Sequence, residues 1–274
     1  MERLDRLGWA AGRAINAYGV RVGVRTTDPA ILHAMEETLP PGWTAARGRS
    51  VSHMFSLVAG GPGEGKGVRK MWILYDGWVR EARSREAGPV LEALNSAVRL
   101  KVAEHAPRRV FVHAGCVAWK GRAIVIPGRS YSGKTTLVAE LVKAGATYYS
   151  DEYAVLDAQG RVHPFPSQLS IRAPGSYDGE LHDAAALGGR TGRRPLPIGM
   201  VLVTRYREGG RWRPRALSPA EGALALLADT VPARSRPHAA MEAVTAAVRG
   251  AEILKGSRGE AVETVPAVLQ RLLA

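Results

Sequence analysis

The stretch that decides the fold is Ala123–Leu141, AIVIPGRSYSGKTTLVAEL. It begins with an apolar run, AIVIP, that is typical of a buried strand, and it ends in a run whose apolar residues recur at helical spacing. Between the two lies Gly128–Thr135, which fits the pattern G-x-x-x-x-G-K-[ST] at every position. A strand, a glycine-rich loop and a helix in this order predict a phosphate-binding loop, or P-loop.

Each residue type in this loop has a chemical reason to be there. Glycines let the backbone curl so that several N–H groups point at phosphate oxygens, and the following helix directs the positive end of its dipole to the same place. We expect Lys134 to bridge the β- and γ-phosphates of ATP and Thr135 to place its hydroxyl on Mg²⁺. The residues expected to bind ATP are Gly128, Arg129, Ser130, Tyr131, Ser132, Gly133, Lys134, Thr135 and Thr136.

A second glycine-rich segment, Gly60–Gly67, has the same pattern as far as its lysine. It lacks the final serine or threonine, and the strand-like MWILYDGW follows it instead of a helix. We therefore interpret it as a hairpin turn between strands at 51–59 and 71–82.

Two adjacent carboxylates, Asp151 and Glu152, follow the helix of the loop and a strand-like run at 147–150. In an open α/β sheet the carboxyl ends of strands meet at the ligand crevice. Since consecutive side chains point in different directions, one carboxylate can face the acceptor while the other faces the metal. A charged surface turn is the alternative, but the position after a P-loop favours catalysis.

The rest of the chain predicts an α/β protein with a boundary near residue 107. We expect an N-terminal α+β accessory portion over 1–107 and a P-loop domain over 108–274. For the first portion the pattern predicts a helix over 1–17, a strand over 18–24, and helices over 28–39 and 89–105. For the second it predicts strands over 109–118, 153–156 and 200–206, a loop over 175–197, a capping box at 218–221, and a helical tail interrupted near Gly256.

Composition narrows the class of protein. The 274 residues carry a formal net charge of +13 and a single cysteine, Cys116. One cysteine excludes an internal disulfide framework and a cysteine-based zinc site, and no segment has the apolar length of a membrane helix. We expect a cytoplasmic protein without a membrane partner. The basic charge favours an anionic partner or merely reflects arginine-rich usage.

Basic residues are concentrated between residues 186 and 216, where the only acid is Glu208. The arginines are Arg190, Arg193, Arg194, Arg205, Arg207, Arg211, Arg213 and Arg215. They could grip an acidic acceptor or the transferred phosphoryl group, or form a solvated surface. Nucleic acid is not favoured as a partner, because no aromatic stacking platform or recognition-helix pattern accompanies them.

The stretch FVHAGCVAWKGRAIVIPGRSYSGKTTLVAELVKAGATYYSDEYAVLD, which starts at Phe111, resembles the HPr kinase/phosphorylase family and its shorter relatives. Those relatives include kinases that modify serine in ribosomally made peptides such as lasso-peptide precursors. The shared pattern is a histidine on the strand before the P-loop, the P-loop itself, a glycine after its helix and an acidic pair. Here these are His113, Gly128–Thr135, Gly145 and Asp151-Glu152. The resemblance covers roughly residues 110–172.

The resemblance implies a P-loop core of the HPr kinase/phosphoenolpyruvate carboxykinase type. It also implies ATP-dependent transfer of the γ-phosphoryl group to a hydroxyl, most simply a serine of a peptide or protein. Asp151 would be the general base, Glu152 would help to hold Mg²⁺, and Lys134 and His113 would complete the catalytic set. For His113, a buried strand histidine bonded to backbone is an equal alternative.

Other functions stay open at this point. The acceptor could be a small alcohol or an amino acid, and a nucleotide-binding regulator without transfer activity also fits the motif. The family proper has Asp-Asp where this chain has Asp151-Glu152, and residues 1–107 do not resemble its regulatory domain. We therefore do not expect HPr as the substrate or the reverse phosphorylase reaction. A homo-oligomer is compatible with the sequence.

Overall fold

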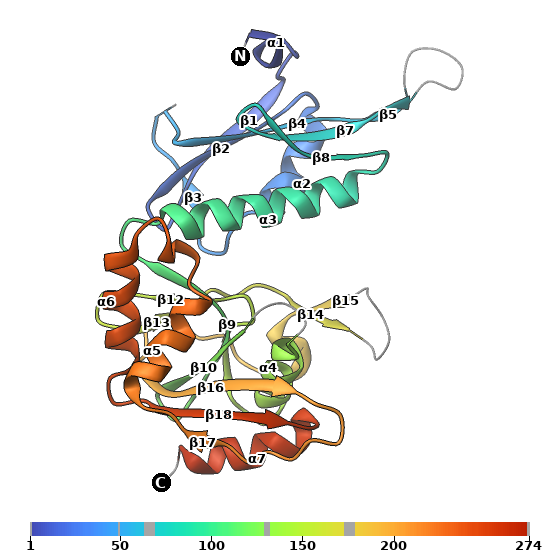
Figure 1. The fold of residues 1–274 in the computed structure, drawn as a ribbon. Coiled ribbons are helices and arrows are strands. Elements are labelled where there is room, and N and C mark those ends of the chain that lie inside the picture. Colours follow the sequence, from blue (N-terminus) through green and yellow to red (C-terminus); the bar gives the residue numbers. More distant parts are fainter. Residues whose placement is uncertain (1, 49, 63–68, 129–131, 173–178, 273–274) are drawn as a thin grey trace. The chain divides into compact units, whose positions relative to one another are not determined.

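The computed structural model describes residues 2–48, 50–62, 69–128, 132–172 and 179–272 of the chain. The chain divides into two compact units, Met1–Pro107 and Arg108–Ala274. Each unit combines helices with a sheet, so the fold is of the mixed α/β class (Figure 1). Within the described residues, no helix is both long and apolar enough to cross a membrane.

The first unit is a six-stranded sheet with the order β3-β1-β2-β4-β7-β8, in which only β2 and β4 are parallel. Its long helix α3 packs against β7 and β8 (Figure 1). The strands are β1 Ala11–Ala17, β2 Val20–Thr26, β3 Thr44–Ala45, β4 His53–Val58, β7 Trp72–Asp76 and β8 Val79–Ser84, with the short pair β5 Gly61–Pro62 and β6 Arg69–Lys70. The helices are α1 Glu2–Asp5, η1 Pro29–Ile31, α2 Leu32–Glu37 and α3 Ala87–His105.

Two predictions for this unit are wrong because tight turns reverse the chain. Residues 1–17 do not form one helix: after α1, the strand β1 folds back onto β2 through Tyr18 and Gly19, which both have positive φ, 52° and 87°. Residues 71–82 are not one strand, because Gly77, with a φ of 58°, turns β7 into β8. The long helix α3 and the antiparallel pairing of β4 with β7 are confirmed. Most of the turn predicted at Gly60–Gly67 lies outside the described residues.

The second unit is built on an eight-stranded sheet with the order β13-β12-β9-β10-β16-β18-β17, and β11 also pairs with β9. The central strands β10, β16 and β18 are parallel, whereas β9 is antiparallel to all its neighbours. The strands are β9 Val110–Trp119, β10 Arg122–Pro127, β11 Thr147–Ser150, β12 Tyr153–Leu156, β13 Val162–His163, β16 Ile198–Tyr206, β17 Arg215–Ala216 and β18 Glu252–Arg258, with a separate pair β14 Leu169–Arg172 and β15 Gly179–His182. The helices are α4 Lys134–Lys143, η2 Ala184–Leu187, α5 Pro219–Ala228, η3 Val231–Ala233, α6 Pro237–Val248 and α7 Ala261–Arg271.

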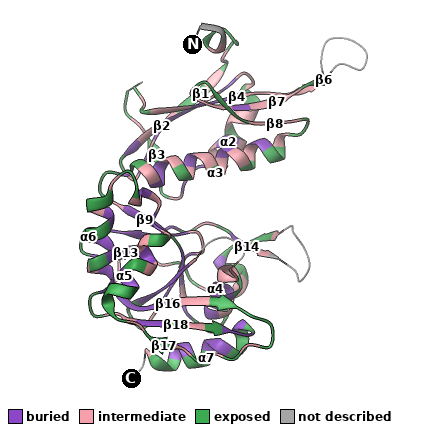
Figure 2. Ribbon diagram, in the orientation of Figure 1, coloured by how far each residue is buried: buried purple, intermediate pink, exposed green. Residues whose placement is uncertain are grey.

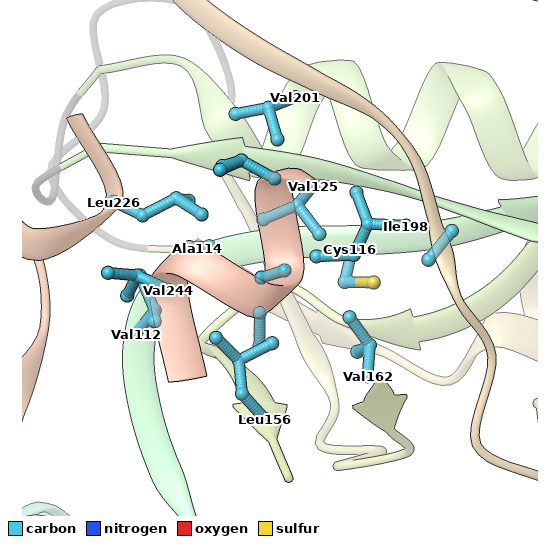
Figure 3. Packing of buried hydrophobic residues seen from close by; sticks show 14 of the residues in the cluster. Val112, Ala114, Cys116, Val125, Leu156, Val162, Ile198, Val201, Leu226 and Val244 are labelled. Atoms are coloured by element: carbon cyan, nitrogen blue, oxygen red, sulfur yellow. The ribbon is translucent and has the colours of Figure 1, made fainter. Parts of the chain in front are cut away.

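Helices cover both faces of this sheet because its strands are apolar on both sides. Alternate residues of β9 point to opposite faces. Val112 and Ala114 pack with α5 and α6, as Figure 3 shows, and Cys116 is buried among them. Val117 packs with α4 and α7 in the second core. In Figure 2 most of β9 and the first part of β16 are correspondingly coloured as buried, while the outer sides of α5 and α6 are exposed.

Most predicted elements of this unit are confirmed. These are the strands β9 to β12 and β16, the helix α4, and the capping box in which Ser218 and Glu221 bond reciprocally at the start of α5. The predicted loop over 175–197 is wrong where β15 and η2 form. The prediction of a helical tail is wrong at Glu252–Arg258, which form the strand β18. This strand forms because β16 and β17 bond to its two edges. Gly256 lies within β18, where a Cβ would come 3.1 Å from Pro214 Cα.

A buried carboxylate, Asp157, closes the turn between β12 and β13. Its Oδ1 accepts the backbone N–H groups of Gln159 and Arg161, each at 3.0 Å. Its Oδ2 accepts Arg161 Nε at 2.9 Å and lies 2.9 Å from His163 Nε2. Burial alone would raise the pKa of Asp157, but the bonds from His163 and Arg161 hold that pKa below its ordinary value.

We predict that Asp157→Asn makes the fold less stable at neutral pH and less sensitive to acid. A carboxylate with a depressed folded-state pKa stabilises the fold above the ordinary aspartate value of about 3.9, and this contribution is lost as the pH falls through the folded value. The expected loss at pH 7 is about 1–3 kcal/mol, measured by thermal unfolding between acidic and neutral pH. Asp183→Asn, an exposed position, is the matched control. Parallel pH profiles for Asp157→Asn and the wild type would contradict the assignment.

Candidate functional site

The candidate site lies where β9 is joined to other segments on both of its edges. On one edge, Gly128 N donates to His113 O at 3.2 Å, at the point where β10 ends. On the other edge, Ala114 N donates to Glu152 O at 3.2 Å, in the break between β11 and β12. These backbone bonds bring together His113, the start of the glycine-rich loop and the acidic pair. The sequence pattern predicts that these three parts lie close to one another.

The loop after β10, residues 128–133, is called the glycine loop below. Gly128 and Gly133 both have positive φ, 149° and 81°, and Gly133 directly precedes α4. The Lys134 side chain points back to the end of β10, where its Nζ donates to Gly128 O at 2.5 Å. Ser132 Oγ is buried and has no hydrogen-bond partner within the described residues. The predicted ligands Arg129, Ser130 and Tyr131 lie outside the described residues, and Thr136 is exposed on α4.

Helix α4 packs very closely onto β9 at Gly115. A Cβ on Gly115 would lie 2.5 Å from Val138 Cγ2 and 3.9 Å from Lys134 Cβ. Only glycine leaves room for Val138, so the residue at 115 sets how closely α4, which begins with Lys134, can approach the strand. The sequence pattern did not single out Gly115; its one signal is a glycine within an otherwise apolar strand, which often marks a close backbone approach.

Asp151 is hydrogen-bonded to side chains from two other elements. Thr135, in the first turn of α4, donates to the carboxylate of Asp151. The Tyr148 hydroxyl lies 3.2 Å from Asp151 Oδ1 and 2.8 Å from Ser167 O. Burial raises the pKa of Asp151 above its ordinary value, against the opposing effects of these hydrogen bonds and of the Lys134 charge. A carboxylate with a raised pKa is better suited to accept a proton than an exposed one.

Lys134 also interacts with a carboxylate that the sequence pattern did not predict, Asp229. Burial lowers the pKa of Lys134, and the charges of Asp229 and Asp151 oppose that change. Asp229 lies at the C-terminal end of α5, and its carbonyl accepts His113 N at 2.8 Å. A carboxylate at the negative end of a helix dipole is unfavourable, and the charge of the half-buried Lys134 offsets this cost. Local costs of this kind are typical of functional sites.

His113 and Glu152, the other two predicted residues, belong to the same site. The His113 side chain is exposed rather than buried, and its ring centroid lies 4.8 Å from that of Tyr153. Crowding by protein atoms and the charge of Lys134 lower the pKa of His113, which favours the neutral imidazole. Glu152 is half-buried, and its backbone N–H donates to Ser150 Oγ at 3.1 Å. It is Asp151, not Glu152, that accepts the hydrogen bond from Thr135.

The eight arginines of the segment 186–216 are all exposed. Arg215 forms an ion pair with Glu221 at 3.4 Å. Exposed pairs of this kind contribute little to stability. Each of these arginines is therefore accessible from solvent, which is compatible with both interpretations of the segment.

Comparison with known protein families finds no family model that matches this chain, and comparison with curated proteins finds no matching sequence.

We predict that Gly115→Ala lowers the melting temperature and weakens ligand binding at the glycine loop. The added methyl group would force Val138 and α4 away from β9, at a cost of about 1–3 kcal/mol for overpacking. Thermal unfolding measures this cost. Gly88→Ala is the control, because a Cβ there, at an exposed position of α3, meets open space. A wild-type melting temperature for Gly115→Ala would show that the close packing is not required.

Proposed function

We propose that this protein is an ATP-dependent kinase that transfers the γ-phosphoryl group of ATP to a hydroxyl, most simply that of a serine in a peptide or protein. The observation that carries the proposal is the cluster of Lys134, Thr135 and Asp151 at the start of α4, directly after the glycine loop. A lysine, a hydroxyl and a carboxylate at a helix N-terminus are the groups that phosphoryl transfer from a magnesium nucleotide requires.

The described residues fit a nucleotide phosphate group. The positive φ of Gly128 and Gly133 curves the backbone, and the Ser132 hydroxyl is a buried polar group without a hydrogen-bond partner among the described residues. The N–H groups at the start of α4 and its dipole favour an anion. These features support ATP as the ligand.

The donor set also fits Mg²⁺, which prefers oxygen ligands and is commonly held by one or two protein oxygens together with substrate phosphates. Thr135 and Asp151 would supply such oxygens. The described part of the chain contains no group of three or more His, Cys, Asp or Glu residues that could hold a metal ion. When bound, Mg²⁺ neutralises the charge on the phosphates. The hydrogen bond from Thr135 makes Asp151 a candidate ligand beside Glu152.

The side chains of this site would act mainly by position and charge. Lys134, whose Nζ bonds to Gly128 O, would hold the terminal phosphates. Asp151, whose pKa is raised by burial, would take the proton of the acceptor hydroxyl. Asp229, which also attracts Lys134, would keep the lysine oriented on the side of α5.

The class of acceptor is the least constrained part of the proposal. A serine of a peptide or protein is supported by the resemblance of Phe111–Asp157 to peptide and protein serine kinases. The exposed arginines of residues 186–216 favour an acceptor with acidic character. Small alcohols and free amino acids are tested alongside peptides.

We predict that the wild type transfers labelled phosphate from ATP to a serine-containing peptide and that Asp151→Asn lowers the rate by at least about 10²-fold, because the acceptor proton loses its base. The assay uses acidic and basic peptide pools, free serine and simple alcohols. Asp183→Asn, an exposed aspartate outside the site, should keep the wild-type rate.

Different outcomes separate the parts of this proposal. Labelling of a small molecule and of no peptide would replace the acceptor class while keeping the kinase. Equal rates for Asp151→Asn and the wild type would remove Asp151 from its role. Binding of ATP with no transfer to any acceptor would favour a nucleotide-binding regulator.

A further inference from the structure

Arg258, the last residue of β18, is buried directly against the glycine loop. Its exposed fraction is 1%, and it ranks among the largest fully buried side chains of the described residues. Burying a guanidinium is expensive unless its donors and its charge are satisfied. The cost of burying Arg258 at this place therefore has to be offset by what its guanidinium contacts.

The guanidinium of Arg258 connects the loop to the end of the sheet. Its Nη2 donates to Gly133 O at 2.7 Å, and its Nη1 donates to Gly259 O at 2.9 Å. The contact with Gly133 depends on the absence of a side chain there, since a Cβ would lie 2.7 Å from Nη2. Gly133 thus needs to be glycine both for its left-handed φ of 81° and for this contact.

The bond to Gly133 O also affects the direction of the neighbouring Lys134 N–H. The Gly133 carbonyl and the Lys134 N–H belong to one planar peptide, and the described chain contains no cis peptide bond. In a trans peptide these two groups point in opposite directions. The same carbonyl also accepts Leu137 N at 3.2 Å, the first hydrogen bond of α4. Arg258 adds a shorter bond to it and so helps to keep the Lys134 N–H pointing away from the guanidinium; backbone N–H groups are the donors that such loops offer to phosphate.

The charges around Arg258 are consistent with this role. Arg258 lies near the Tyr206 ring, with 5.7 Å from the guanidinium carbon to the ring centroid, and Tyr206 donates to Glu260 at 2.8 Å. Arg258 Nε is buried without a hydrogen-bond partner among the described residues. Burial lowers the pKa of Arg258, while Glu260 opposes that change. A positive charge held behind the loop adds to the attraction for an anion in front of it.

We propose that Arg258 is a positioning residue for the Gly133–Lys134 peptide at the start of α4, which it helps to orient so that the Lys134 N–H group faces the phosphates of the nucleotide. This inference rests on the proposed function, because it presumes that the loop binds nucleotide phosphates. Arg258 acts through Gly133, and the sequence pattern places it in the tail of the chain, far from the motif.

The test compares Arg258→Met, Arg258→Lys and Arg271→Met in the full chain. Arg271 lies on α7 and pairs with Glu252 at the opposite end of β18, so its variant controls for loss of an arginine that braces the same strand. For each protein we measure the melting temperature without nucleotide and the Kd for Mg–ATP. A merely structural role would lower the melting temperature and leave the Kd of the folded protein unchanged.

The expected result is that Arg258→Met weakens Mg–ATP binding by about 10-fold or more, since a tenfold loss corresponds to one misplaced hydrogen-bonding group. Arg258→Lys, which keeps the charge but reaches one carbonyl at a time, should restore part of this loss, and Arg271→Met should bind as the wild type does. A folded Arg258→Met with the wild-type Kd overturns the inference; if that variant does not fold, a wild-type Kd for Arg258→Lys does so. A wild type that does not bind Mg–ATP instead overturns the proposed function.

Discussion

Two backbone hydrogen bonds at the middle of β9 hold the candidate site together. Gly128 N bonds to His113 O on one edge of the strand, and Ala114 N bonds to Glu152 O on the other. Gly128 and the acidic pair are therefore both anchored to the same inner strand, one on each side of it. Backbone bonds of this kind do not depend on side-chain identity, so the arrangement is set by the register of β9 with its neighbours.

Close packing brings charged side chains to this part of β9. Gly115 lets α4 approach β9, and Gly133 lets Arg258 approach the loop; at both positions a Cβ would lie within 3 Å of a neighbouring atom. The approach of α4 brings Lys134 and Thr135 to Asp151. Burying these charges costs folding free energy, which the apolar cores on both faces of the sheet offset. Such a local cost in folding free energy is typical of functional sites.

The sequence predicts the local parts of this arrangement well. The strands β9 and β10, the helix α4 and the interrupted pair β11 and β12 follow from apolar patterns and turn residues that are neighbours in the chain. The cluster of Lys134, Thr135 and Asp151 follows from the topology of a strand, loop, helix and strand. The roles assigned to these residues stay predictions.

What the sequence could not predict depends on contacts between distant segments. Strand β18 forms because β16 and β17 bond to its two edges, although Gly256 lowers the strand propensity of this segment. Arg258 and Asp229 reach the loop only because the sheet and α5 carry them there. The hairpin of β1 and β2 was missed for a local reason, since Tyr18 adopts a positive φ that is uncommon for a residue with a side chain.

The central claim is that the glycine loop and Asp151 form a site for a magnesium nucleotide. Calorimetric titration of the full chain with ATP, with and without Mg²⁺, tests it most directly. The account predicts saturable binding at one site per chain, tighter than about 1 mM and strengthened by Mg²⁺. No saturable heat in either titration, or the same affinity in the presence and absence of Mg²⁺, would contradict it.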